Sequence, residues 1–197
     1  MPIVLNGTTG ITTAAIDLTT PLSVADGGTG VRDVLPYRMF VGTAIATTAS
    51  TFIDFTGIPS WAKRITVMLN GVSTNGASIV RILLGTSAGI TTTGYLGSTL
   101  SSSVNTLSVG TWAGDIPTGN AAINAAASVR NGIITVVKGS DTTYFIHGSL
   151  GYSDTTMGAE IKGTSTLPAI IDRVRITTVN GIDLFDAGSV NIMYEGY

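Results

Sequence analysis

A single histidine limits the acid–base chemistry open to this chain of 197 residues. If residues 144–150 form a strand, side-chain alternation places His147 on the same face as Phe145 and Ser149. A Ser-His-Asp hydrolase would use His147 as its base, together with an orienting acid and an oxyanion site. Two neighbours on one strand supply neither of these, so we interpret His147 as a structural residue.

The acidic residues are also poorly placed for catalysis or metal binding. Glu160 lies two residues before Lys162, which favours an exposed ion pair over one half of a glycosidase carboxylate pair. Asp172, Asp183 and Asp186 are the nearest approach to a calcium-binding set, but no loop shows the alternating Asp/Asn ligand pattern. Turn capping is the favoured role for these aspartates. The sequence therefore predicts no enzymatic activity, no metal site and no cofactor.

Aromatic residues beside glycine-rich loops are the best candidates for ligand binding. Exposed rings on loops stack on the apolar faces of sugars and of other ligands. Trp112, Tyr95 and Tyr152 fit this description, and we expect them to be receptor- or glycan-binding residues. Packing at a subunit interface or under a loop is the alternative for each ring.

The composition restricts the possible partners. Only 11% of the residues are charged, against about 25% in typical soluble domains, yet no apolar run approaches the roughly 18 residues of a membrane-spanning helix. We therefore expect no membrane insertion, and we attribute the scarcity of charge to surfaces covered by other subunits. A net charge of −2 without a basic block disfavours nucleic-acid binding. The absence of cysteine is typical of a protein assembled in a reducing cytoplasm.

Short strand-like segments separated by turns fill residues 38–197. Turn signals every 8–12 residues predict an all-β domain, an antiparallel jelly-roll-like β-sandwich of about ten strands. Three hairpins are expected. One joins residues 65–69 to 78–84, one joins 132–138 to 142–150 through the compact turn 139–141, and one closes the domain around Asn180-Gly181, a strong turn dipeptide. Residues 155–168 are predicted to be mostly loop with one short strand. Residues 121–129 are compatible with helix or strand, and strand is favoured.

Residues 1–37 differ from the rest of the chain. Turn-forming clusters at 6–10 and 25–30 surround short apolar patches that cannot form a core of their own. Such a segment is ordered only on a partner surface or among identical segments wound around it. We therefore predict an extended N-terminal arm and linker.

The body of the chain, from about residue 52 to residue 194, resembles the C-terminal domain of phage tail-fibre proteins. Three segments carry the resemblance: IDFTGIPSWAKRITV (53–67), LGTSAGITTTGY (84–95) and NGIDLFDAGSVNIMY (180–194). The arm is similar to the beginnings of short phage fibre proteins, in which a junction like ADGGTG (25–30) recurs. This resemblance implies a virion protein, typically a homotrimer that is attached through its N-terminal part and faces outward with its C-terminal part.

The resemblance leads to an expected function without catalytic residues. The chain would be a short trimeric fibre whose arm contacts other phage virion proteins and whose sandwich adheres to a host-surface glycan or receptor. The long shaft of a typical tail fibre is missing, so a capsid head fibre or decoration (cement) protein without receptor binding is the alternative. The candidates for virion attachment are the apolar residues of the arm, Ile3, Val4, Leu5, Ile16 and Leu18.

Overall fold

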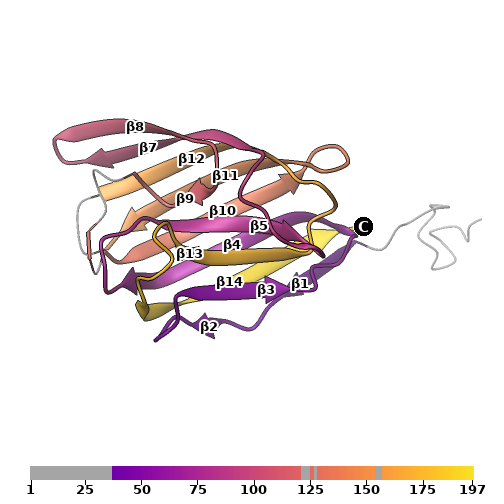
Figure 1. Cartoon of the computed structure of the whole chain (residues 1–197), viewed down its shortest axis with the longest axis horizontal. Helices are drawn as coiled ribbons and strands as arrows, with labels where there is room; N and C mark the ends of the chain where they lie inside the picture. The colour runs from indigo at the N-terminus through magenta and orange to yellow at the C-terminus, as the bar shows by residue number, and fades with distance from the viewer. Residues whose placement is uncertain (1–36, 121–124, 127, 154–156) are drawn as a thin grey trace, which may run out of the picture. The chain divides into compact units, whose positions relative to one another are not determined.

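The computed structural model describes residues 37–120, 125–126, 128–153 and 157–197, which belong to one compact unit, Tyr37–Tyr197. These residues form two antiparallel β-sheets, of nine and five strands, packed as the layers of a β-sandwich (Figure 1). No helix occurs among them, so none of them forms a helix able to cross a membrane. The expected all-β class is confirmed.

The larger sheet has nine strands. Its strand order is β1 (Arg38–Val41), β14 (Phe185–Gly196), β4 (Ala62–Thr74), β10 (Arg130–Lys138), β11 (Thr143–Tyr152), β12 (Met157–Thr166), β7 (Tyr95–Ser103) and β8 (Thr106–Trp112), and β2 (Ile45–Ala46) also pairs with β14.

The smaller sheet covers one face of the larger sheet. Its order is β3 (Phe52–Thr56), β13 (Arg173–Thr178), β5 (Val80–Thr86) and β6 (Gly89–Ile90), and β9 (Ile116–Pro117) also pairs with β5. The described residues of the domain thus form fourteen strands, three of them only two residues long, where about ten were expected.

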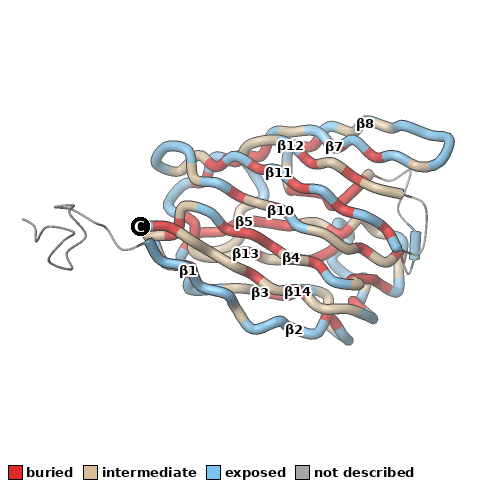
Figure 2. Tube along the Cα trace, turned by 180° about the vertical axis from the view of Figure 1, so that it is seen from behind, coloured by how far each residue is buried: buried red, intermediate tan, exposed pale blue. Residues whose placement is uncertain are grey.

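The core lies between the two sheets and follows from the alternation of side chains. Along β11, Tyr144 and Ile146 are buried, whereas Phe145 and His147 are exposed. Figure 2 shows buried and exposed positions alternating along the strand. The core residues of β4, β5, β10 and β13 are dominated by Ile, Val and Leu. Burial of these branched side chains supplies the main driving force for stacking the sheets.

Of the three expected hairpins, the one that joins 132–138 to 142–150 is confirmed, because β10 pairs with β11. The other two are wrong, because the strands on either side of each turn belong to different sheets. β4 and β5 lie in opposite layers, and so do β13 and β14. The turn at Asn180 does form, with Gly181 at a φ of +70°, but residues 179–184 carry the chain across the sandwich. Turn chemistry fixes a local change of direction, whereas the partner of each strand is decided by packing over the whole sheet.

The expectation of a loop at residues 155–168 is also wrong. β12 is a ten-residue strand paired with β11 on one side and β7 on the other. Its Gly, Ser and Thr content weakens the local strand signal, and pairing on both edges compensates for that weakness. Within residues 121–129, positions 121–124 and 127 lie outside the described residues, and the others form neither helix nor strand.

A tryptophan covers the inner face of the large sheet near its β8 edge. Trp112 on β8 lies opposite Gly97 on β7, which in turn lies opposite Gly163 on β12. A Cβ atom at Gly97 would lie 2.5 Å from Cε2 of Trp112, and one at Gly163 would lie 2.5 Å from Cη2. The two glycines therefore make the space in which the indole ring packs across two neighbouring strands.

This packing predicts that Gly97→Ala destabilises the domain. The added methyl group would meet both the indole ring and the Lys162 carbonyl oxygen at 2.5 Å, and overpacking of this kind costs about 1–3 kcal/mol. Urea unfolding followed by circular dichroism measures the loss. Gly151→Ala is the matched control, because a Cβ there has no neighbour within 4 Å. Equal stability of the two variants would contradict the proposed packing.

Candidate functional site

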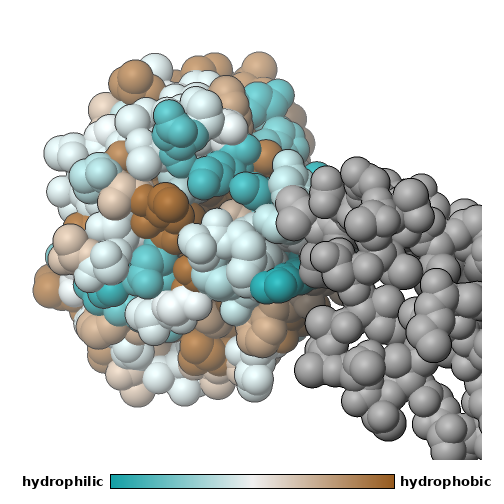
Figure 3. Space-filling view, turned by 90° about the vertical axis from the view of Figure 1, so that its right-hand side faces the viewer, coloured by the Kyte–Doolittle hydropathy of each residue, from teal (hydrophilic) through white to brown (hydrophobic). Residues whose placement is uncertain are grey.

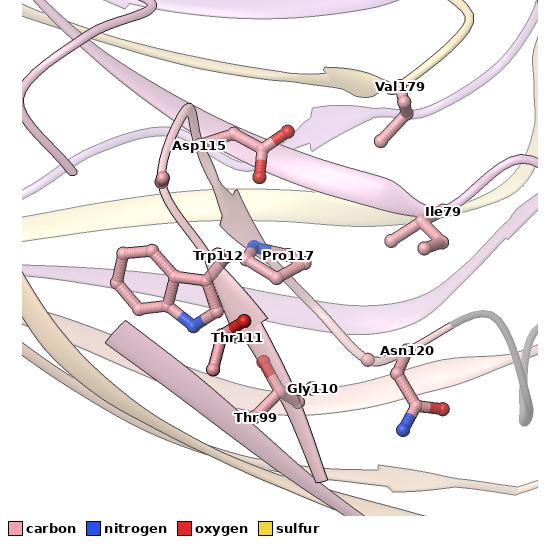
Figure 4. Close-up of a pocket in the computed structure, with 11 residues that line it drawn as sticks. Ile79, Thr99, Gly110, Thr111, Trp112, Asp115, Pro117, Asn120 and Val179 are labelled. Atoms are coloured by element: carbon pink, nitrogen blue, oxygen red, sulfur yellow. The ribbon is translucent and has the colours of Figure 1, made fainter. Parts of the chain in front are cut away.

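A cavity of about 330 Å³ opens at the end of the sandwich that contains β7 and β8 (Figure 4). Its lining from the large sheet comes from Thr99 on β7 and from Gly110 and Trp112 on β8. Because Gly110 has no side chain, the space above β8 stays open at this point. The inner face of the large sheet therefore contributes one hydroxyl group and one indole ring to the cavity.

The remaining walls come from three other parts of the chain. Asp115 and Pro117 belong to the segment that follows β8, Ile79 precedes β5, and Val179 follows β13. This segment includes β9, which pairs with β5 of the smaller sheet. The cavity thus lies where a short connecting segment, in place of a full strand, joins the edges of the two sheets.

Two buried polar atoms belong to residues that line this cavity and have no hydrogen-bond partner among the described residues. They are Nε1 of Trp112 and Oγ1 of Thr99, whose residues are 7% and 1% exposed. An unsatisfied buried donor or acceptor costs about 1–3 kcal/mol. Both atoms are fully buried, so neither is open to water or to a ligand in the cavity.

The charge in the cavity wall is balanced. Oδ2 of Asp115 lies 3.2 Å from Nη1 of Arg81, and their side chains are 17% and 22% exposed. The pair combines a hydrogen bond with a Coulombic attraction at a partly buried position. The lining consequently presents a carboxylate whose charge is matched by an adjacent guanidinium.

The three aromatic residues expected to bind ligands are buried, so the expectation that they are exposed on loops is wrong. Tyr95 is 1% exposed, Tyr152 is 3% exposed, and Trp112 is buried as described above. Each ring projects from the inner face of a strand of the large sheet. The expectation failed because the neighbouring glycines lie at the ends of strands and not in loops that expose the rings. Side-chain alternation along those strands directs the rings into the core. Only Trp112 reaches the cavity.

Tyr95 has a structural role between the sheets. Its hydroxyl accepts a hydrogen bond from the Leu84 N–H at 2.6 Å and donates one to the Thr91 carbonyl oxygen at 3.0 Å. Burial raises the pKa of this phenol to about 12. The neutral hydroxyl group thus links β7 of one sheet to β5 of the other.

Tyr152 also contacts groups within the domain. Its hydroxyl donates to the Thr118 carbonyl oxygen at 3.2 Å, and the Arg130 guanidinium lies 5.4 Å from its ring centroid. Arg130 is fully buried and donates to the Ser128 carbonyl oxygen at 2.8 Å. A cation over an aromatic face is favourable when both are removed from water, so this ring helps to accommodate a buried charge.

The possible hydrolase residues lie together on the outer face of the large sheet, but in an order unsuited to catalysis. The Ser149 hydroxyl donates to Glu160 Oε1 at 2.7 Å, and His147 Nε2 lies 4.0 Å from Glu160 Oε2. In a catalytic triad the serine bonds to the histidine, which the acid orients. Here the carboxylate is the central group. The expected ion pair between Glu160 and Lys162 is not formed. The partners of Glu160 are instead Ser149 and His147 on the adjacent strand.

The aspartates considered for calcium have partners within the domain. Asp183 accepts a hydrogen bond from the Ser78 N–H at 2.9 Å, Asp172 lies 2.9 Å from Arg173, and Asp186 accepts one from the Ser73 hydroxyl. In the part of the chain that the structure describes, no three His, Cys, Asp or Glu residues are grouped to hold a metal ion. The bond from Asp183 connects the 179–184 crossing to the start of β5.

A second candidate site is the outer face of the large sheet, opposite the core. Apolar side chains are exposed along this face in the central and β8-side strands: Ile133, Val137, Phe145, Leu96, Leu100, Leu107 and Val109. The strand register places Phe145 beside Val137, and Leu100 beside Val109. The sequence reasoning missed this face. The signal was the apolar run Ile133–Val137 in β10, which only Thr135 interrupts and which is typical of a strand covered on both sides.

Comparison with known protein families, curated proteins and solved structures finds no match for this chain. The cavity and the outer face are therefore the observations from which a function can be argued. The candidates for virion attachment, Ile3, Val4, Leu5, Ile16 and Leu18, lie outside the described residues.

Tyr95→Phe is predicted to destabilise the domain by about 1–3 kcal/mol, because the buried Leu84 N–H loses its acceptor. The pH dependence adds a second test. The folded-state pKa of about 12 exceeds the usual 10.0, so the phenol's contribution is complete below pH 10 and is lost as the pH rises towards 12. Unfolding curves recorded from pH 8 to 12 should fall less steeply above pH 10 for Tyr95→Phe than for the unmodified chain. Parallel curves would contradict this role of Tyr95.

Proposed function

We propose that this chain is a non-enzymatic virion appendage protein, a short phage fibre whose β-sandwich assembles as a homotrimer and adheres to the host surface. The observation that carries the proposal is the outer face of the nine-stranded sheet. This face is broad and poor in unpaired charge, and it exposes large apolar side chains at the positions where a sheet normally meets water. Such a face is suited to burial against copies of itself.

The energetics of the face favour burial. Phe145 is 56% exposed, Ile133 is 49% exposed and Val109 is 68% exposed, and each apolar Å² removed from water contributes about 25 cal/mol. Most of the charged groups on this face have partners within the subunit, whereas Lys162 on β12 is exposed and forms no ion pair with another described residue. Arg64 and Glu195 form a salt bridge at 2.7 Å, and Glu160 accepts a hydrogen bond from Ser149. Burial against another subunit would therefore leave few isolated charges, which are the main obstacle to association.

The surface beyond this face agrees with an assembled role. On the side of the domain seen in Figure 3, hydrophobic and weakly polar residues predominate and strongly hydrophilic residues form only small groups. With 11% charged residues overall, the domain has the composition of an obligate subunit more than that of a free monomer.

The trimeric state and the phage virion come from the sequence resemblance. Two of its segments meet in the large sheet, because 53–67 continues into β4 and 180–194 continues into β14, the strand paired with β4. We also propose a jelly-roll relationship for the sandwich, since the chain alternates between layers from β3 to β5 and again from β12 to β14. In this proposal the arm, residues 1–37, attaches the trimer to the particle.

Phe145→Lys is predicted to convert the trimer into monomers. The side chain is exposed within one subunit, so the substitution leaves the core intact and places a charge at the centre of the proposed interface. Light scattering after size-exclusion chromatography should give the mass of three 20.1-kDa chains for the unmodified protein and of one for the variant. Ile182→Lys is the matched control, because Ile182 is 75% exposed on the crossing between β13 and β14.

If the Phe145→Lys variant remained trimeric, the outer face would be excluded as the trimer interface. Adsorption tests the adhesive function separately: purified trimer should bind host cells and block infection by the phage. A soluble trimer that binds no host cell would contradict adhesion. Quantification of copies per particle then separates a tail fibre, with a handful of copies, from a capsid decoration protein, with tens to hundreds.

A further inference from the structure

We infer that His147 makes the assembly of this protein pH-dependent, so that protonation of its imidazole in mildly acidic solution separates the subunits. The inference rests on the proposed trimer and adds the group by which that trimer is regulated. The single histidine of the chain lies among the exposed apolar side chains of the outer face of the large sheet.

The strand register places His147 inside the apolar part of this face. On β10 it lies opposite Thr135. Phe145 and its partner Val137 lie on one side of this pair, and Ile133 lies on the other side. A second subunit that covers both Phe145 and Ile133 therefore also covers His147, whose side chain is 65% exposed in the isolated subunit. Assembly would remove most of the water around the imidazole.

Two charged groups lie beside His147, and both belong to β12. Lys162 is directly opposite it in the register. Glu160 lies on the diagonal, with its Oε2 atom 4.0 Å from Nε2 of His147, and it accepts a hydrogen bond from the Ser149 hydroxyl at 2.7 Å. The imidazole is thus flanked by one cation and one carboxylate.

On the remaining sides, the neighbours of His147 in the strand register carry no charge. They are Phe145 and Ser149 on β11 and Ile133, Thr135 and Val137 on β10. The charged group that follows on β4, Arg64, lies opposite Val137 and is paired with Glu195 at 2.7 Å. Glu160 and Lys162 are therefore the charges that decide how a proton on His147 is accommodated.

The charge of this cluster changes when His147 binds a proton. While the imidazole is neutral, the charges of the Glu160 carboxylate and the Lys162 ammonium group cancel. Once the imidazole is protonated, the single carboxylate faces two cations and the cluster gains a net positive charge in each subunit. Like charges directly opposite each other on neighbouring strands are destabilising, and His147 and Lys162 occupy such positions.

Burial on assembly converts this extra charge into a dependence on pH. Removing an unbalanced charge from water disfavours the charged form, so the free subunit binds the proton more readily than the trimer does. By linkage, association is at full strength above the pH range in which histidine titrates and weakens as the pH falls through it. Histidine is the side chain that ordinarily changes charge between pH 5 and 8, and the chain has one histidine and no cysteine.

The experiment measures the mass of the full-length protein by sedimentation equilibrium at pH 7.5 and at pH 5.5, over a range of protein concentrations. Ordinary carboxylates remain ionised across this interval, whereas histidine does not. The concentration at which half of the chains are assembled should be at least about tenfold higher at pH 5.5, because each subunit gives up a proton when it enters the trimer. Return to pH 7.5 should restore the trimer.

Two substitutions of His147 test the cause. His147→Gln keeps a neutral polar side chain at every pH, so this variant should assemble equally well at pH 7.5 and pH 5.5. His147→Lys carries a charge at both pH values and should assemble poorly at both. Ile182→Lys is the control for an added charge, because Ile182 is exposed on the crossing between β13 and β14. Circular dichroism checks that each variant is folded.

Every result either supports or overturns the inference. Dissociation of the unmodified trimer at pH 5.5 that His147→Gln abolishes supports it. A trimer that stays intact at pH 5.5, or one that dissociates equally with and without His147, overturns the switch and leaves the proposed trimer in place. A His147→Gln variant that does not assemble at pH 7.5, or a His147→Lys variant that assembles fully, also overturns the switch. An unmodified chain that is monomeric even at pH 7.5 refutes the proposed trimer and the switch together.

Discussion

The unequal width of the two sheets is the constraint on which the rest of the domain depends. A sheet of nine strands cannot be covered by one of five, and inward-facing residues near β8 must be removed from water by other means. Trp112 meets part of this need by lying over two glycines, and the segment that contains β9 meets another part by bridging to β5. The cavity is the space that neither Trp112 nor the segment containing β9 fills.

The same constraint explains the outer face. Large apolar residues such as Phe145 and Ile133 lie on the side that no second layer within the subunit covers. In an antiparallel sheet with one solvent-exposed face, apolar and polar residues normally alternate along each strand. β10 departs from this pattern, because it carries apolar residues on both of its faces. In the proposed trimer, further subunits would cover the outer face and complete a second packed layer.

Sequence patterns predicted the class of the fold better than they predicted its connections. Alternation along β11 and the turn at Gly181 follow from local preferences, and both are present in the structure. The choice of partner for β13 and β14 depends on which faces pack together, information that no short window contains. For the residues expected to bind ligands, nearby glycines suggested rings exposed on loops. Side-chain alternation along the strands instead directs Tyr95 and Tyr152 into the core. Thr99 and Asp115 carry no motif and become visible only when the cavity brings them together.

The order of the strands has a consequence for when the subunit becomes competent to assemble. One part of the large sheet joins segments that are close in sequence, as in β10 to β12 and in β7 to β8, whereas β14 pairs with β4 across more than a hundred residues. Local pairings form early and distant ones late. The outer face extends over both parts, from Phe145 on β11 to the Arg64–Glu195 pair that joins β4 to β14. A partly folded chain would therefore present only a fragment of this face, and in the proposed trimer the order of the strands would restrict association to subunits that have finished folding.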